Sequence, residues 1–486
     1  MKSILFENAE EIVRQIAAGE ISSVEVTSQF LAQIKRYNIA INAITDKRDQ
    51  ADILEEAREK DQLMGEGKSL GLLHGLPVTV KDTFNVKGLI TSNGNPRLKS
   101  NIATRDAELV RRLKEAGAII MGKTNLALFA LDWQSDNAWF GKTNNPYDLE
   151  CVVGGSSGGS AASLAAGFTA LELGADAGGS IRVPAHFCGV CGLRTTESAL
   201  PARGNMHSPG QLRIGRYLTT TGPMARSVGD LILMLKVLSN KEQQFSENPP
   251  VDLFQYSLDA NEKLNIAYSD TLGRVDLDRE YKEIYLEFVE KIGQEPGMKL
   301  SNDRPQYNSD RLVDLWGKIA GFDFGVALKG IPFKKLIAST FISKKYKDKQ
   351  WARAMGKGAG LSIRSYAQAL EQKDDISDRF TKFFDQYDVW ITPVSAGPAF
   401  NHQSPGTPFT INEKRLPYTS AFIPFNFPTT VPGHPILVIP IGQTAKGLPV
   451  GIQIHAQKWH DHKLLQIGQV LEKMTPGFRK PNMFDN

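Results

Sequence analysis

Two serines and one lysine have the surroundings that nucleophilic chemistry needs. Ser156 lies in the stretch GGSSGGSAA, Ser180 follows the small residues of GADAGG, and Lys81 ends the apolar run LPVTVK. A serine hydroxyl becomes a good nucleophile when a neighbouring base removes its proton, and an uncharged lysine amine is such a base. The three residues therefore predict a serine–lysine arrangement beside a group of backbone donors.

The glycine-serine loop around Ser156 could serve two other functions, and both fit less well. A phosphate-binding Walker A loop needs a lysine after its last glycine, which is missing, and the glycine spacing does not give the dinucleotide fingerprint. A G-x-S-x-G nucleophile elbow occurs literally at 154–158, with His434 and His455 downstream, but such an elbow follows a long buried strand. The preceding NNPYDLECVV is expected to be a loop with only a short apolar end.

The other two residues also have ordinary structural explanations. Ser180 could cap a helix after a glycine turn, and Lys81 could be an exposed residue paired with Asp82. However, the three small residues before Ser180 would let backbone N–H groups converge on one point, as an oxyanion hole requires. Burial at the end of an apolar strand would lower the pKa of Lys81 and leave its amine neutral. In combination, the catalytic explanation fits better.

The elements that must hold these residues alternate between helix and strand. Helices are expected over the first sixty-odd residues, and Ser22 and Glu25 have the spacing of a capping box. A helix in DAELVRRLKEAG turns its apolar positions inward, namely Leu109, Val110 and Leu113. Strands are expected at 78–80, 119–121 and 168–174 and in YDVWITPV, HPILVIPIG and LPVGIQIHA, the last two as a hairpin. This alternation predicts a layered α/β fold.

Residues 240–380 are more charged and more helical. Within them, lysines alternate with Phe333, Phe341 and Trp351, and we interpret this stretch as an amphipathic surface region with a solvated basic face rather than as a lid or wall over a substrate. Since no internal repeat or low-complexity linker appears, one domain is expected over 1–486. Its parts would be N-terminal helices (1–65), a core (66–239), the variable helical segment (240–380) and C-terminal strands with a helix (381–486).

The composition argues against several classes of protein. A net charge of +4 on 486 residues gives no reason to expect a nucleic acid or an anionic membrane as a partner. No run of about eighteen apolar residues predicts a membrane span, and the first twenty residues lack the apolar core of a secretory signal. Three cysteines (Cys151, Cys188 and Cys191) cannot form a disulfide framework, which suits a cytoplasmic protein. The C-x-x-C pair has no zinc-site partners and is interpreted as two small buried residues.

Together, the stretches GLPVTVKDTF, GGSSGGSAA and GADAGGSIRVPAHFCGVCGLR resemble the amidase signature family, whose members hydrolyse carboxylic amides. Three motifs in this order are far more specific than G-x-S-x-G, and the resemblance covers most of the chain except about 240–365. It implies a single α/β domain whose large central mixed sheet is covered by helices on both faces. It also implies chemistry without a metal or an organic cofactor.

Carried over by position, the resemblance implies that Ser180 is the nucleophile. Ser156 would be the bridging serine, preceded by a cis peptide bond, and Lys81 the base. The oxyanion would be bound by the backbone amides of four consecutive residues: Ala177, Gly178, Gly179 and Ser180. Three neighbours are expected to support this group, namely Ser157, Asp176 and Arg182, the last two as an ion pair. His186 is interpreted as a packing residue.

The sequence departs from the family pattern at two places. Many members have Thr or Ser where Ala175 stands, so the side chain that helps to orient the relay is missing. After CGLR, the usual Pro-Thr-x-Gly-Arg-Val-Ser run is replaced by TTESALPARG, which reshapes the rim of the substrate site.

Three functions are compatible with these residues. We expect an amidase that acts on a small-molecule amide, with specificity set by residues 200–215 and 300–360. The second is the glutaminase subunit of a tRNA-dependent amidotransferase, which usually carries an SSLDQIGP-type stretch where this chain has RYLTTTGPMARS. The third is a catalytically silent binding protein that kept the fold. Whether the chain forms a homodimer is left open.

Overall fold

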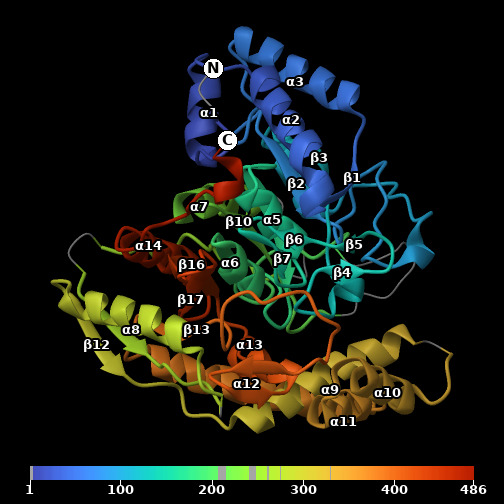
Figure 1. Ribbon diagram of the computed structural model, residues 1–486, viewed down its shortest axis with the longest axis vertical. Coiled ribbons are helices and arrows are strands. Elements are labelled where there is room, and N and C mark those ends of the chain that lie inside the picture. Colours follow the sequence, from blue (N-terminus) through green and yellow to red (C-terminus); the bar gives the residue numbers. More distant parts are fainter. Residues whose placement is uncertain are drawn as a thin grey trace.

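A mixed sheet of eleven strands forms the centre of the molecule (Figure 1). The computed structural model describes residues 4–205, 215–239, 248–259, 262–273, 275–328 and 330–485. The sheet strands are β1 (Ile44–Lys47), β2 (Pro77–Lys81), β3 (Ile119–Thr124), β8 (Leu171–Asp176), β9 (Cys191–Arg194), β10 (Thr220–Ala225), β11 (Leu264–Tyr268), β12 (Met298–Asn302), β13 (Val389–Pro393), β16 (Ile436–Gln443) and β17 (Pro449–His455). Their spatial order is β1-β3-β2-β8-β10-β9-β16-β17-β13-β11-β12.

Parallel pairs occur in both halves of this sheet. Strand β2 runs parallel to β3 and to β8, and β11 runs parallel to β12 and to β13. Antiparallel pairs connect the two groups from β8 through β10, β9, β16 and β17 to β13. Strands β2, β3 and β8 are buried along their whole length, as expected where helices cover both faces of a sheet.

Helices surround the sheet and extend beyond both of its ends (Figure 1). They are α1 (Ala9–Ala17), α2 (Ser23–Ile41), α3 (Gln50–Gly65), α4 (Glu108–Glu115), α5 (Gly158–Ala165), α6 (Arg182–Cys188), α7 (Val228–Leu238), α8 (Arg279–Gln294), α9 (Ser309–Ala327), α10 (Lys334–Tyr346), α11 (Lys349–Gly358), α12 (Ile363–Phe384), α13 (Ile423–Thr430) and α14 (Asp461–Glu472). Figure 1 shows α2 and α3 at one end of the long axis and α9, α10 and α11 at the other. Short hairpins are formed by β4 (Asp136–Asn137) with β5 (Gly141–Lys142), β6 (Asn144–Asn145) with β7 (Asp148–Val152), and β14 (Phe409–Ile411) with β15 (Lys414–Leu416).

The predicted elements around the catalytic motifs are confirmed with small shifts. Strands β2 and β3 contain the predicted 78–80 and 119–121, and β16 and β17 form the predicted hairpin. Both halves of the capping box are present at the start of α2. The predicted strand 168–174 starts and ends later, as β8, because its pairing with β10 continues to Asp176 opposite Thr220.

One prediction about local structure is wrong. NNPYDLECVV is not a plain loop, because it folds into the β6–β7 hairpin, in which the Asn145 side chain donates to the Val152 carbonyl at 3.0 Å. The segment 240–380 is largely helical, as predicted, and it also contributes β11 and β12, which extend the central sheet at one edge. Strands added at an edge by parallel pairing depend on distant partners, so local sequence patterns predict them poorly.

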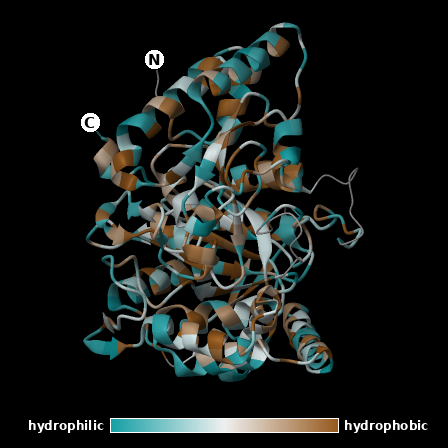
Figure 2. Ribbon diagram, turned by 90° about the vertical axis from the view of Figure 1, so that its right-hand side faces the viewer, coloured by the Kyte–Doolittle hydropathy of each residue, from teal (hydrophilic) through white to brown (hydrophobic). Residues whose placement is uncertain are grey.

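The lysine-rich stretch forms α10 and the start of α11. Its interpretation as an amphipathic region is confirmed for Lys335 and Lys344, which are exposed, and for Trp351, which is buried in an aromatic cluster with Trp133 and Trp316. It does not hold for Phe333, whose side chain is also exposed. Figure 2 shows hydrophilic residues along the outer faces of the helices and hydrophobic residues between the layers. No helix in the part of the chain that the structure describes is both long and apolar enough to cross a bilayer.

Candidate active site

Neighbouring strands bring the three predicted catalytic residues to one edge of the sheet. Lys81 is the last residue of β2, and Ser180 follows β8, which runs parallel to β2. The carboxyl ends of parallel strands meet at the same edge, where open α/β sheets place their ligands. Ser156 lies in the loop between β7 and α5, and the Ser157 amide donates to the Ser180 carbonyl at 3.0 Å. The two glycine-rich loops are thus in direct contact.

The Lys81 amine lies at the centre of this arrangement and is fully buried. Its Nζ donates to Ser156 Oγ and to Ser157 Oγ, both at 2.8 Å, and to the carbonyl of Ala175 at 3.3 Å. The alternative of an exposed lysine paired with Asp82 is wrong. The partner of Asp82 is Lys123, whose Nζ lies 2.9 Å from Asp82 Oδ1.

Burial changes the acid–base character of Lys81. Loss of hydration lowers the pKa of its amine from 10.5 to about 7, although the charges of Asp176 and Glu172 act in the opposite direction. In the dry interior, the charged ammonium form loses more hydration free energy than it gains from its attraction to the two acidic groups. Near pH 7 a large fraction of Lys81 is therefore neutral and able to accept a proton.

The peptide bond between Gly155 and Ser156 is cis, as the family resemblance implies. The hydrogen-bond chain extends from Lys81 to Ser156, but Ser180 Oγ neither donates nor accepts a hydrogen bond among the described residues. Hydrogen bonds between reacting groups are often long in a free enzyme and shorten in the substrate complex. Ser180 and Ala177 are half-buried, whereas the residues between them are buried, so both remain open to a ligand.

The carboxylate of Asp176 organises the loop that carries Ser180. It accepts hydrogen bonds from the amides of Gly179 at 2.9 Å and Ile181 at 3.0 Å. The expectation that the Gly179 amide binds the oxyanion is therefore corrected, because that donor is already occupied by Asp176. The amides of the other three residues in the predicted set have no acceptor within the described residues; they are Ala177, Gly178 and Ser180.

The predicted ion pair between Asp176 and Arg182 is confirmed. Arg182 Nη2 and Nε each lie 3.0 Å from Asp176, and both side chains are fully buried. Burial alone would raise the pKa of Asp176, but the positive charge of Arg182 outweighs it and holds that pKa well below its usual range. Arg182 also donates to Thr430 Oγ1 at 2.7 Å and to Gln453 Oε1 at 2.9 Å, so it connects the loop to α13 and β17.

Sequence reasoning missed a second buried carboxyl group beside the lysine. Glu172 on β8 accepts a hydrogen bond from Thr79 and lies 3.5 Å from Thr124 Oγ1. Burial raises its pKa to about 8, opposed by hydrogen bonds from Thr79 and Ser160. The only signal in the sequence is an acidic residue inside the otherwise apolar run FTALELG.

Two other predictions concern residues that we interpret as packing residues. His186 accepts a hydrogen bond from the Gly451 amide at 2.7 Å, and burial lowers its pKa to about 4, which agrees with its interpretation as a packing residue. Cys188 and Cys191 are buried free cysteines, as expected.

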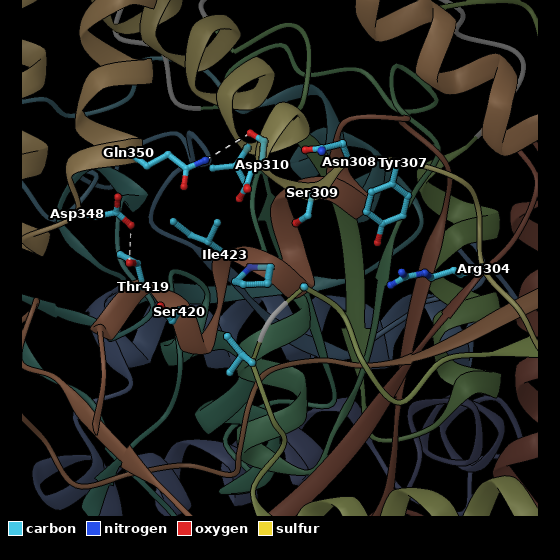
Figure 3. A pocket seen from close by; sticks show the side chains of 14 residues that line it. Arg304, Tyr307, Asn308, Ser309, Asp310, Asp348, Gln350, Thr419, Ser420 and Ile423 are labelled. Carbon is cyan, nitrogen blue, oxygen red and sulfur yellow. Dashed lines mark hydrogen bonds between the residues drawn. The ribbon is translucent and has the colours of Figure 1, made fainter. Parts of the chain in front are cut away.

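The stretch 300–360, expected to set specificity, contributes to a cavity of about 370 Å³ (Figure 3). Arg304, Asp310 and Asp348 supply charged groups to its lining, and Val313 and Ile423 supply apolar surface. No catalytic candidate lines this cavity. Of the other expected specificity stretch, 200–215, residues 206–214 lie outside the described part of the chain.

Comparisons with known proteins give the family to which the chain belongs. The profile of the Amidase family matches residues 25–465. One glutamyl-tRNA(Gln) amidotransferase subunit, from Picosynechococcus sp., is 30% identical over 96% of this chain and 98% of that protein. An acylamidase from Rhodococcus erythropolis is 28% identical over 96% of this chain and 95% of that protein. A solved structure of an amidase is 25% identical, with a TM-score of 0.78 over 96% of this chain and 100% of that one.

The chain therefore belongs to the amidase signature family. It is an amide hydrolase of that family, and its α/β fold with a large mixed sheet is the fold of its structural neighbours.

Proposed function

We propose that the protein hydrolyses a carboxylic amide of a small molecule through an acyl-enzyme on Ser180. The observation that carries this proposal is the contact of a buried lysine, whose pKa is lowered to about 7, with the hydroxyl of Ser156 at 2.8 Å. A serine–lysine pair of this kind replaces the histidine of the better-known triad.

The proposed reaction begins with proton transfer along the hydroxyl groups. Neutral Lys81 accepts the Ser156 proton, Ser156 accepts the Ser180 proton, and Ser180 Oγ adds to the amide carbonyl carbon. The negative charge that develops on the carbonyl oxygen is stabilised by backbone amides of the loop. When the intermediate collapses, Ser156 passes a proton to the leaving amine and the C–N bond breaks. Water then attacks the ester, its proton follows the same path, and Ser180 is released with a carboxylate product.

Backbone donors supply the electrostatic part of this mechanism. The amides of Ala177, Gly178 and Ser180 are the candidates, since the Gly179 amide is occupied by Asp176. Removing one such donor from a known hydrolase lowers kcat by about 10²–10³. Because Asp176 and Arg182 are paired and fully buried, the loop is held in one conformation before substrate binds.

A fluorophosphonate probe tests the assignment of the nucleophile. The wild-type protein is expected to be labelled on one serine, which peptide mapping would identify as Ser180, and Ser180→Ala is expected to lose both labelling and hydrolysis of a panel of amides. Ser163→Ala is a matched control, because Ser163 is a buried serine on α5 outside the proposed relay. Labelling of a different serine, or full amide hydrolysis by Ser180→Ala, would contradict the assignment.

A second candidate function is favoured by the relatives. Several of them, at about 30% identity over nearly the whole chain, are subunits of glutamyl-tRNA(Gln) amidotransferases. The same relay would then release ammonia from glutamine within a complex. Ammonia release from L-glutamine, together with co-purification of a tRNA-binding subunit, would support this function. Hydrolysis of other amides by the isolated chain, without activity on glutamine, would favour the first.

A further inference from the structure

Two tryptophan side chains hold the backbone of the loop that precedes Ser180. Trp316 Nε1 donates to the carbonyl of Ala177 at 2.7 Å, and Trp133 Nε1 donates to the carbonyl of Gly178 at 3.0 Å. Trp316 lies on α9, in the segment with weak family resemblance, and Trp133 lies in the loop before β4. Both residues are only 4% exposed, so water does not compete strongly for these bonds.

The two bonds determine where the neighbouring N–H groups point. A trans peptide unit is planar, and its C=O and N–H groups point in opposite directions. The carbonyl of Ala177 shares its unit with the N–H of Gly178, so the bond from Trp316 also sets the direction of that N–H. The carbonyl of Gly178 shares its unit with the N–H of Gly179, which donates to Asp176. The peptide unit between Gly178 and Gly179 is therefore held at both its carbonyl and its N–H. The unit between Ala177 and Gly178 is held only at its carbonyl, and its N–H remains a free donor.

The glycines need this support because they have few conformational restraints of their own. A Cβ atom on Gly178 would lie 2.7 Å from the Phe427 ring, so that ring covers the loop directly. Trp316 stacks on Phe427 with ring centroids 3.7 Å apart and an interplanar angle of 16°. The stack lies about one helical turn from Val313 on α9 and from Ile423 on α13, which line the cavity of Figure 3. Packing between α9 and α13 thus holds the Trp316 indole in place, and the indole in turn orients the peptide unit between Ala177 and Gly178.

We propose that Trp316 and Trp133 are positioning residues: Trp316 aims the free Gly178 N–H of the 177–180 loop at the oxyanion, and Trp133 holds the adjoining peptide unit in place. The inference rests on the proposed function, because the donors matter only if Ser180 forms a tetrahedral intermediate. Complete removal of one donor costs about 10²–10³ in rate, and a misaligned donor loses only part of this, so about a tenfold loss is expected for Trp316. A smaller loss is expected for Trp133, because Asp176 also holds its peptide unit. The loss falls on kcat, since the oxyanion exists only in the transition state and the intermediate.

The experiment compares three substitutions in one aromatic cluster. Trp316→Phe and Trp133→Phe keep an aromatic ring and remove the N–H donor. Trp351→Phe is the matched control, because its ring lies 6.2 Å from that of Trp316 and 5.8 Å from that of Trp133. The buried Trp351 Nε1 has no hydrogen-bond partner among the described residues. Each variant is checked for folding by its thermal transition before any rate is measured.

The first readout is the second-order rate constant for reaction with a fluorophosphonate, in which Ser180 Oγ bonds to phosphorus, fluoride leaves and the serine proton passes to Lys81 through Ser156. The second is the inhibition constant of a trifluoromethyl ketone, which adds the serine to its carbonyl and leaves an oxyanion. Neither measurement requires the natural substrate. A purely structural role would not weaken binding of the ketone selectively over binding of the non-covalent carboxylate that carries the same acyl group.

The labelling rate constant of Trp316→Phe is expected to fall about tenfold and that of Trp133→Phe by less, with ketone affinity falling in parallel and carboxylate binding unchanged. The rate constant of Trp351→Phe is expected to stay within about twofold of the wild type. Equal behaviour of Trp316→Phe and Trp351→Phe, whether both are active or both impaired, would overturn the positioning role. Failure of the wild-type protein to be labelled on Ser180 would instead overturn the proposed function, and the positioning role with it.

Discussion

Replacing Lys81 by methionine is expected to abolish hydrolysis and to change how stability depends on pH. In the unfolded chain the lysine keeps its ordinary pKa of 10.5, and in the folded protein burial lowers that pKa to about 7. Between these values the unfolded state binds more protons at Lys81 than the folded state, so the contribution of this residue to the free energy of unfolding rises with pH by up to about 1.4 kcal/mol per unit. At pH 7 and below, burial of this amine therefore costs roughly 4–5 kcal/mol, a cost that disappears as the pH approaches 10.

Methionine has no proton to release, so the variant lacks this dependence. It also leaves Ser156 and Ser157 without a donor, which costs about 1 kcal/mol per hydrogen bond at every pH in this range. The diagnostic quantity is therefore the slope: any stability advantage of Lys81→Met at pH 7 should shrink by about 1 kcal/mol from pH 7 to 8 and by about 1.3 kcal/mol from pH 8 to 9.

Urea unfolding followed by tryptophan fluorescence at pH 7, 8 and 9 measures this difference. Lys344→Met is the control, because Lys344 is exposed and its surroundings change little on unfolding. A stability difference between Lys81→Met and the wild type that stays constant from pH 7 to 9, or widens in favour of the variant, would refute the conclusion that Lys81 is buried as a neutral amine.

Two further predictions concern the charges around the relay. The kcat/KM of the wild type should rise about tenfold per pH unit below pH 7 and level off above about 8, because only neutral Lys81 accepts a proton. Glu172→Gln should leave this rise nearly unshifted, since burial raises the pKa of Glu172 to about 8 and its carboxyl group is therefore mostly uncharged below pH 7. A pH-rate profile of both proteins checks this, and a clear shift of the rise to lower pH in the variant would show that Glu172 is charged beside Lys81. Arg182→Met should lower the free energy of unfolding by about 3–5 kcal/mol, because the fully buried Asp176 carboxylate then keeps only the more distant Arg194, whose Nε lies 3.9 Å from Asp176 Oδ1. Urea unfolding at pH 7 measures the loss, and a change below about 1 kcal/mol would show that other groups compensate the charge.

The catalytic candidates can be recognised from the sequence because their signals are local. Glycines and alanines gather around Ser156 and Ser180, and Lys81 ends a short β-branched run, so composition over about ten residues predicts a tight loop or a buried strand end. The strands that hold them are predictable for the same reason, since β2 and β3 are short apolar runs between turn residues.

The contacts that tune these residues join distant parts of the chain, and folding alone establishes them. No local pattern distinguishes Trp316 from other apolar helix positions, yet its indole reaches a carbonyl 139 positions earlier in the chain. Similarly, the Gly179 amide is occupied only because the folded loop brings the Asp176 carboxylate within hydrogen-bond distance of it. The lowered pKa of Lys81 depends on the packing of α5 and β8 against its amine, which excludes water. Hydrogen-bond direction and desolvation are properties of the packed interior, and residue order along the chain does not encode them locally.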